Sequence, residues 1–93
     1  MALAIQPNSA DARYNFALAL KGAGYVPDAL NELRHFVEAH PDEVRGQLAL
    51  ANLYAQKLHD TAQARDYYRK VLELEPDGGQ AAEIRSWLAA HSN

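Results

Sequence analysis

The stretch from Leu48 to Pro76, LALANLYAQKLHDTAQARDYYRKVLELEP, decides the fold of this chain. In its first half, large apolar residues recur with helical spacing from Leu50 to Leu58, as an amphipathic helix requires. Asp60 and Thr61 can then start a second helix, because a side-chain oxygen caps the free amide groups of its first turn. A second apolar stripe ends at Pro76, since the residue before a proline disfavours the helical conformation. The stretch therefore predicts two helices joined by a tight turn.

The same pattern precedes this stretch. The sequence predicts one helix from Ala10 to about Gly22 and a second that starts at Pro27 and stops before Pro41. A proline suits the first turn of a helix, where its missing amide is no loss. After the stretch, glycines 78 and 79 break the chain, and a last helix is predicted from Gln80 to about His91. No segment of any length shows the alternation that is typical of a strand.

The prolines give the period of the pattern. Pro7 and Pro41 are 34 residues apart, and Pro41 and Pro76 are 35 residues apart. Paired helices that repeat at roughly this spacing are typical of a helical solenoid. We therefore predict an all-α fold, a helical solenoid of two antiparallel helix-pair repeats plus a C-terminal capping helix. The expected units are residues 7–41, 42–76 and 77–93, and residues 1–6 are expected to be the stub of a truncated preceding helix.

These residues resemble the tetratricopeptide repeat family. The family pattern places large residues and a small one in the first helix of each unit, and an alanine, an aromatic residue and a closing proline around the second. The chain departs from this pattern at Arg13, Leu20, Phe36 and Gln47. The matching residues are Phe16, Ala17, Ala29, Leu33 and Pro41 in the first unit, and Leu50, Ala51, Tyr54, Ala64, Tyr68 and Pro76 in the second.

The two ends of the predicted stack differ. One repeat after the core residues of the second unit, the last helix carries Arg85 and Ser86, so its outer face is polar, as a terminal unit requires. The first helix instead presents Ala12, Ala19 and Ala23 toward a missing predecessor. This pattern predicts a fragment from the C-terminal end of a longer array, whose uncovered first helix promotes homodimers.

Composition excludes several function classes. The net charge of the 93 residues is −3, which argues against the basic face of a nucleic-acid-binding protein. No apolar run approaches the roughly 20 residues that span a bilayer. Met1 to Ile5 is too short for a secretory signal and lacks its basic start. We expect no nucleic-acid or membrane partner, and the compartment is left open with the cytoplasm as the default.

The predicted concave face is the candidate site. Residues one repeat apart stack into columns, and the first helices of successive units line this face. In the resembled family, the groove holds peptide segments of partner proteins. The resemblance therefore implies a non-catalytic protein-interaction module that binds a protein or peptide partner. The candidate groove residues are Asp11, Tyr14, Leu18, Arg45, Leu48, Asn52, Gln56, Glu83 and Trp87.

Alternatives to this groove remain open. Trp87 can instead seal the last helix onto the stack, and Tyr14 can cover the edge of the core, since surface aromatic residues are common without a ligand. Some family members clamp a C-terminal carboxylate. Tyr14 and Leu48 occupy the usual lysine positions of that clamp here, so we do not predict it. The alternative function is a structural spacer or self-association end of a larger protein, with no groove ligand.

Signals for catalysis are weak. The histidines at positions 35, 40, 59 and 91 lie on different segments without the spacing of metal ligands. The chain contains no cysteine, and no glycine-rich phosphate loop follows a strand. We therefore predict no catalytic residues, no metal site and no cofactor.

Overall fold

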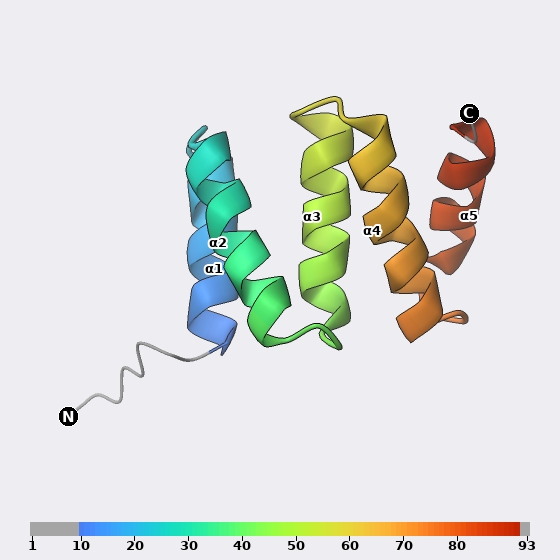
Figure 1. Ribbon diagram of the computed structural model, residues 1–93, viewed down its shortest axis with the longest axis horizontal. Coiled ribbons are helices and arrows are strands. Elements are labelled where there is room, and N and C mark those ends of the chain that lie inside the picture. The colour runs from blue at the N-terminus through green and yellow to red at the C-terminus, as the bar shows by residue number, and fades with distance from the viewer. Residues whose placement is uncertain (1–9, 92–93) are drawn as a thin grey trace.

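The chain folds into a single row of antiparallel helices (Figure 1). The computed structural model describes residues 10–91, and that range contains helices but no strand. Each helix packs against the next one, and the molecule measures 50 × 28 × 19 Å along its principal axes. This elongated arrangement confirms the predicted all-α helical repeat. The helices are α1 (Ala10–Gly22), α2 (Val26–Ala39), α3 (Val44–Gln56), α4 (Thr61–Leu74) and α5 (Ala81–Ala90).

Local signals account for the helix ends. Pro27 lies in the first turn of α2, as predicted. The Asp60 carboxylate accepts a hydrogen bond from the Gln63 amide at 3.2 Å and caps α4, which confirms that start signal. The α1–α2 turn requires Gly24, whose φ of 93° favours a residue without a Cβ. These turns are short, so neighbouring helices must lie antiparallel.

Small residues allow the paired helices to pack closely. Ala17 and Ala29 lie in α1 and α2, and Ala51 and Ala64 lie in α3 and α4. All four have exposed fractions of 0%. A methyl side chain lets two helix backbones approach, and larger neighbours then interlock around the contact. The complete burial of these four alanines fits this role.

The junction between α2 and α3 explains two departures from the family pattern. Phe36 is fully buried where a small residue is usual, and it faces Gly46, which has no side chain. The Phe36 ring therefore occupies the space that a side chain at position 46 would need. Gln47 is only 3% exposed, and its amide nitrogen donates to the Pro41 carbonyl at 3.1 Å. This hydrogen bond ties α3 to the turn before it and satisfies a buried polar group.

Phe16 matches a large residue of the family pattern but is 54% exposed. Phe16 lies on a face of α1 where Ala19 is also exposed, as is Ala23 just after the end of the helix, and no other described helix packs against that face. Phe16 belongs to the apolar pattern of the sequence, but this pattern does not say which side of α1 another helix covers.

The two faces of α5 differ as predicted. Ala81 and Ile84 are 5% and 3% exposed, while Arg85 and Ser86 are exposed to solvent. The Arg85 guanidinium donates to the Pro76 carbonyl at 2.6 Å, outside the core. The assignment of residues 7–41, 42–76 and 77–93 to two repeats and a cap stays a prediction. The stub predicted for residues 1–6 lies outside the described residues.

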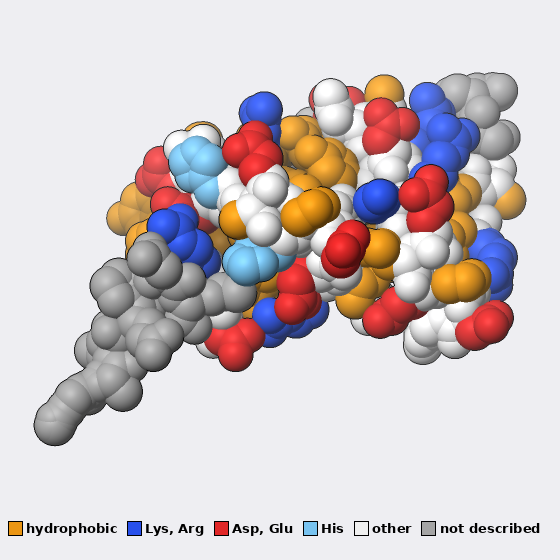
Figure 2. Space-filling view, turned by 60° about the horizontal axis from the view of Figure 1, so that its bottom comes forward, with side chains coloured by type: hydrophobic (Ala, Val, Ile, Leu, Met, Phe, Trp, Pro, Cys, Tyr) orange, Lys and Arg blue, Asp and Glu red, His pale blue; other side chains and the backbone are white. Residues whose placement is uncertain are grey.

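Charged side chains of both signs are dispersed over the surface. On the face seen in Figure 2, acidic and basic side chains are interspersed, with small groups of apolar side chains between them. Some of these charges form ion pairs, such as Lys70 with Glu73 at 3.6 Å and Arg13 with Glu32 at 4.0 Å. Exposed pairs of this kind contribute only about 0–1 kcal/mol each to stability. The fold therefore depends on the apolar contacts between helices.

Candidate partner-binding groove

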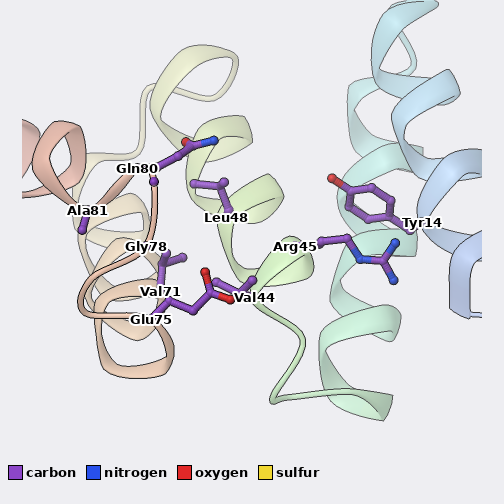
Figure 3. A pocket seen from close by; sticks show the side chains of 10 residues that line it. Tyr14, Val44, Arg45, Leu48, Val71, Glu75, Gly78, Gln80 and Ala81 are labelled. Carbon is purple, nitrogen blue, oxygen red and sulfur yellow. The ribbon is translucent and has the colours of Figure 1, made fainter.

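Two adjoining hollows lie along the row of helices. The first has a volume of about 420 Å³, and Figure 3 shows Tyr14 and Arg45 on one side of it and Glu75 and Ala81 on the other. The second has a volume of about 210 Å³. Gln80 lines both, so we treat them together and call them the groove. The first hollow is lined by Tyr14, Val44, Arg45, Leu48, Val71, Glu75, Gly78, Gly79, Gln80 and Ala81. The second is lined by Asn52, Gln56, Tyr68, Gln80, Glu83, Ile84 and Trp87.

The structure brings most of the predicted site residues together. Tyr14, Arg45 and Leu48 line the first hollow. The second hollow contains the predicted residues of α3 and α5, which are Asn52, Gln56, Glu83 and Trp87. Asp11 lines neither hollow but binds Arg45. Leu18 is 36% exposed and also lines neither hollow, so it is not brought together with the others.

Several lining residues were not predicted. Val71 and Glu75 come from α4 and its end, which the predicted columns of first-helix residues did not include. Gly78 and Gly79 come from the α4–α5 turn, which was read only as a break. The available signal was the short distance along the chain between Glu75 and the start of α5. A turn this short keeps the end of α4 beside the first turn of α5.

Arg45 organises one end of the first hollow. Its guanidinium contacts the Asp11 carboxylate at 2.9 Å and the Glu43 carboxylate at 3.2 Å. The hydrogen bond to Asp11 raises the pKa of Arg45 above its ordinary value. The guanidinium carbon also lies 4.9 Å from the centre of the Tyr14 ring. The positive charge of Arg45 is therefore compensated by two carboxylates before any ligand binds.

The two aromatic candidates are engaged in packing. The Tyr14 ring centre lies 5.7 Å from that of Phe36, so Tyr14 covers the edge of the core. Trp87 lies between Tyr68, at 4.7 Å, and His91, at 4.2 Å. These contacts support the alternative that Trp87 seals α5 onto α4. Both residues shape the walls of the groove rather than offering a ring with two open faces.

A hydrogen bond fixes the wall between α3 and α4. The Tyr68 hydroxyl donates to the Asn52 side-chain oxygen at 2.6 Å. The amide nitrogen of Asn52 then remains as a donor beside the second hollow. Burial raises the pKa of the Tyr68 hydroxyl above its ordinary value. Burial also raises the pKa of the Tyr67 hydroxyl, and the electrostatic interaction with the nearby Tyr54 raises this pKa further.

Raising the pH above about 10 is expected to lower the free energy of unfolding. The unfolded chain releases the protons of Tyr67 and Tyr68 at a lower pH than the folded chain does, because folding raises both pKa values. This contribution to stability is complete below the unfolded pKa and is lost as the pH rises through the folded pKa. Urea unfolding at a series of alkaline pH values measures the slope. The double variant Tyr67→Phe/Tyr68→Phe should show a flatter slope, and an unchanged slope would contradict the assignment.

The first hollow combines an apolar floor with an unpaired charge. Val44, Leu48, Val71 and Ala81 supply apolar side chains from three helices. The Glu75 side chain extends toward the α3 side of the hollow in Figure 3. Among residues 10–91, Glu75 forms no ion pair and its carboxylate receives no hydrogen bond. Its charge is therefore available to a ligand.

The described part of the chain offers neither a metal-ion cluster nor a membrane-spanning helix. No group of three or more histidine, cysteine, aspartate or glutamate side chains is placed to hold a metal ion there. None of the described helices combines the length and the apolar character that crossing a membrane would need. The groove is the candidate site because its two hollows adjoin and most of the predicted site residues line them.

Comparison with known proteins gives one similarity. No protein-family model matches the chain. The chain is similar to Protein O-mannosyl-transferase Tmtc3 of Drosophila melanogaster, with 28% identity over 79 residues. The matched segment covers 85% of this chain but only 8% of that protein, so the chain corresponds to a small part of its relative. Together with the five-helix row, this similarity supports a helical repeat of the tetratricopeptide type.

Proposed function

We propose that this chain is a non-catalytic protein-interaction module and that its groove binds a short segment of a partner protein. The two adjoining hollows on one side of the helix row are the observation that carries the proposal. The transferase activity in the name of the relative is not assigned to this chain, because the match covers 8% of that protein.

The lining suits a polypeptide segment. The hollows follow α1, α3 and α5 in turn, so a segment lying across the row contacts three helices. The half-buried Val44 and Leu48 offer apolar area to its side chains. The amides of Asn52, Gln56 and Gln80 each have donors and acceptors that suit its backbone. Apolar area beside a few polar groups is typical of binding sites.

Leu48→Gln is expected to weaken binding of such a segment by about tenfold or more, because it replaces part of the apolar floor with an amide. The measurement is a selection of short random peptides on the 93-residue chain, followed by titration of an enriched synthetic peptide. Leu30→Gln is the matched control, since Leu30 is also half-buried and packs on the same core but lines neither hollow.

The two variants separate binding from stability. Both must show the helical circular dichroism of the unchanged chain. The proposal fails if no peptide is enriched, or if every enriched peptide binds the Leu48→Gln variant as tightly as the unchanged chain.

A second candidate function is self-association through α1, with no ligand in the groove. The observation that favours it is the exposure of Phe16 and Tyr25, at 54% and 59%, beside the exposed Ala19 and Ala23. Exposed aromatic side chains next to small apolar ones are typical of surfaces between protein copies. In this function the chain acts as a spacer or a dimerising end.

Light scattering over a range of concentrations tests self-association. We expect a concentration-dependent homodimer that is lost in Phe16→Ala/Tyr25→Ala, because these substitutions remove the two large exposed rings. The Leu48→Gln variant should dimerise as the unchanged chain does. A strict monomer at the highest concentration contradicts this second function and leaves the groove proposal standing.

A further inference from the structure

We propose that the groove selects a basic and apolar segment, with an apolar side chain in the first hollow and lysine or arginine side chains at Glu75 and Glu83. This inference rests on the proposed function and names the chemistry of its partner. It follows from the balance of charges along the groove, from the floor of the first hollow, and from the lack of an uncompensated cation.

The free charges along the groove are acidic. Glu75 lines the first hollow and Glu83 lines the second. Neither carboxylate forms an ion pair or accepts a hydrogen bond within residues 10–91. Arg45 is the one basic residue among the lining side chains of the two hollows. Because Asp11 and Glu43 already bind it, the groove offers a ligand two carboxylates and no free cation.

The positions of these groups fit a basic side chain. In Figure 3, Arg45 lies toward α1, whereas Glu75 extends from the end of α4 toward Val44. Val44 lies between these charged ends in this view, and Leu48 follows it one turn further along α3. The aliphatic stem of a lysine or arginine can cover Val44 and Leu48 while its charged end reaches Glu75. A hydrogen bond between two charged groups is about twice as strong as one between neutral groups.

The volume of the first hollow also accommodates an apolar side chain. About 420 Å³ lies within the range of about 300–1,000 Å³ that is usual for ligand pockets. Gln80 lies between the two hollows, where its amide can donate to and accept from the backbone of a bound segment. An apolar residue and a basic residue can therefore bind side by side.

The charges of the groove disfavour an acidic segment. Its carboxylates would lie near Glu75 and Glu83, and like charges placed together disfavour a complex. The guanidinium of Arg45 would have to leave Asp11 or Glu43 before it could compensate them. The charge of the groove thus disfavours acidic segments and favours basic ones. Specificity commonly arises from such a combination of repulsion for one ligand and attraction for another.

Short random peptides selected on the 93-residue chain test this inference. We expect the enriched peptides to combine apolar residues with lysine or arginine. Their affinity should fall when NaCl is raised from about 0.1 M to about 1 M, because the Debye length shortens from about 10 Å to about 3 Å. Glu75→Gln/Glu83→Gln should bind an enriched peptide about tenfold more weakly.

A matched control has the same change of net charge. Glu38→Gln/Asp66→Asn removes two exposed carboxylates from α2 and α4 that line neither hollow. This variant should bind within about twofold of the unchanged chain, because charges far from the contact are screened. All four substitutions are at exposed positions, so we expect both variants to fold, which circular dichroism checks.

The outcomes distinguish this inference from the proposed function. Enriched peptides that are acidic or uncharged, or that bind Glu75→Gln/Glu83→Gln as tightly as the unchanged chain, overturn the inference. Equal weakening in the control variant also overturns it, because the effect would then be one of net charge. If binding nevertheless requires Leu48, the groove proposal stands. If no peptide depends on Leu48, both fail.

Discussion

Gly46→Ala is expected to lower the free energy of unfolding by about 1–3 kcal/mol. A Cβ at this position would lie 2.6 Å from Cδ2 and 2.8 Å from Cε2 of Phe36, and 3.0 Å from Cγ2 of Val37. The Phe36 ring is fully buried and cannot swing into solvent. Alanine in a helix normally gains about 0.5–1 kcal/mol over glycine. Here the overlap outweighs that gain, because α2 and α3 must move apart to admit the methyl group.

Gly22→Ala is the control for this prediction. A Cβ at Gly22, the last residue of α1, has no heavy atom within 4 Å. We expect this substitution to be neutral or slightly stabilising. In a Phe36→Leu background the cost of Gly46→Ala should shrink, since contacting residues are coupled. Urea unfolding of Gly46→Ala, Gly22→Ala, Phe36→Leu and Phe36→Leu/Gly46→Ala measures the four free energies of unfolding. A Gly46→Ala chain as stable as the unchanged one would show that α2 and α3 do not meet as described.

Phe36→Ala is expected to lower the free energy of unfolding by about 3–5 kcal/mol. Phe36 is among the largest fully buried side chains, and its ring lies 5.7 Å from Tyr14 and 5.4 Å from His40. It also fills the space that Gly46 leaves on α3. Removing the ring therefore opens a cavity where α1, α2 and α3 meet. Thermal unfolding followed by circular dichroism should show a large fall in the midpoint.

Phe16→Ala removes the same ring from the surface. Because Phe16 is 54% exposed, we expect a loss of about 1 kcal/mol or less, measured at a concentration where the chain is monomeric. The pair of substitutions tests which phenylalanine of the first helix pair belongs to the core. Equal losses, or a larger loss for Phe16→Ala, would contradict the packing of α1 against α2.

The features of the fold that could be predicted from the sequence are those that depend on local signals. The spacing of the prolines indicated the helix pairs, the Asp60 cap marked the start of α4, and glycines marked two of the turns. Alanine at positions 17, 29, 51 and 64 indicated where helices approach. Each of these signals acts over a few residues or through a contact that only a small side chain permits. The all-α fold could therefore be predicted before the structure was known.

The contribution of neighbouring elements could not be predicted in the same way. Phe16 and Phe36 are both apolar residues of the first helix pair, yet only Phe36 is buried. The sequence does not say which face of α1 is covered. Glu75 and Gly78 line the first hollow because the α4–α5 turn places them there. Leu18 has the predicted column spacing but lines neither hollow.

Backbone-amide NMR of the chain, titrated with the tightest peptide selected on it, tests most directly whether the groove is the binding surface. We expect the largest shifts at amides around the two hollows, including Arg45, Leu48, Gln80 and Glu83. Amides on the exposed face of α1, around Phe16 and Ala19, should shift little. Shifts concentrated on that face of α1, with the amides of the hollows unchanged, would contradict the account.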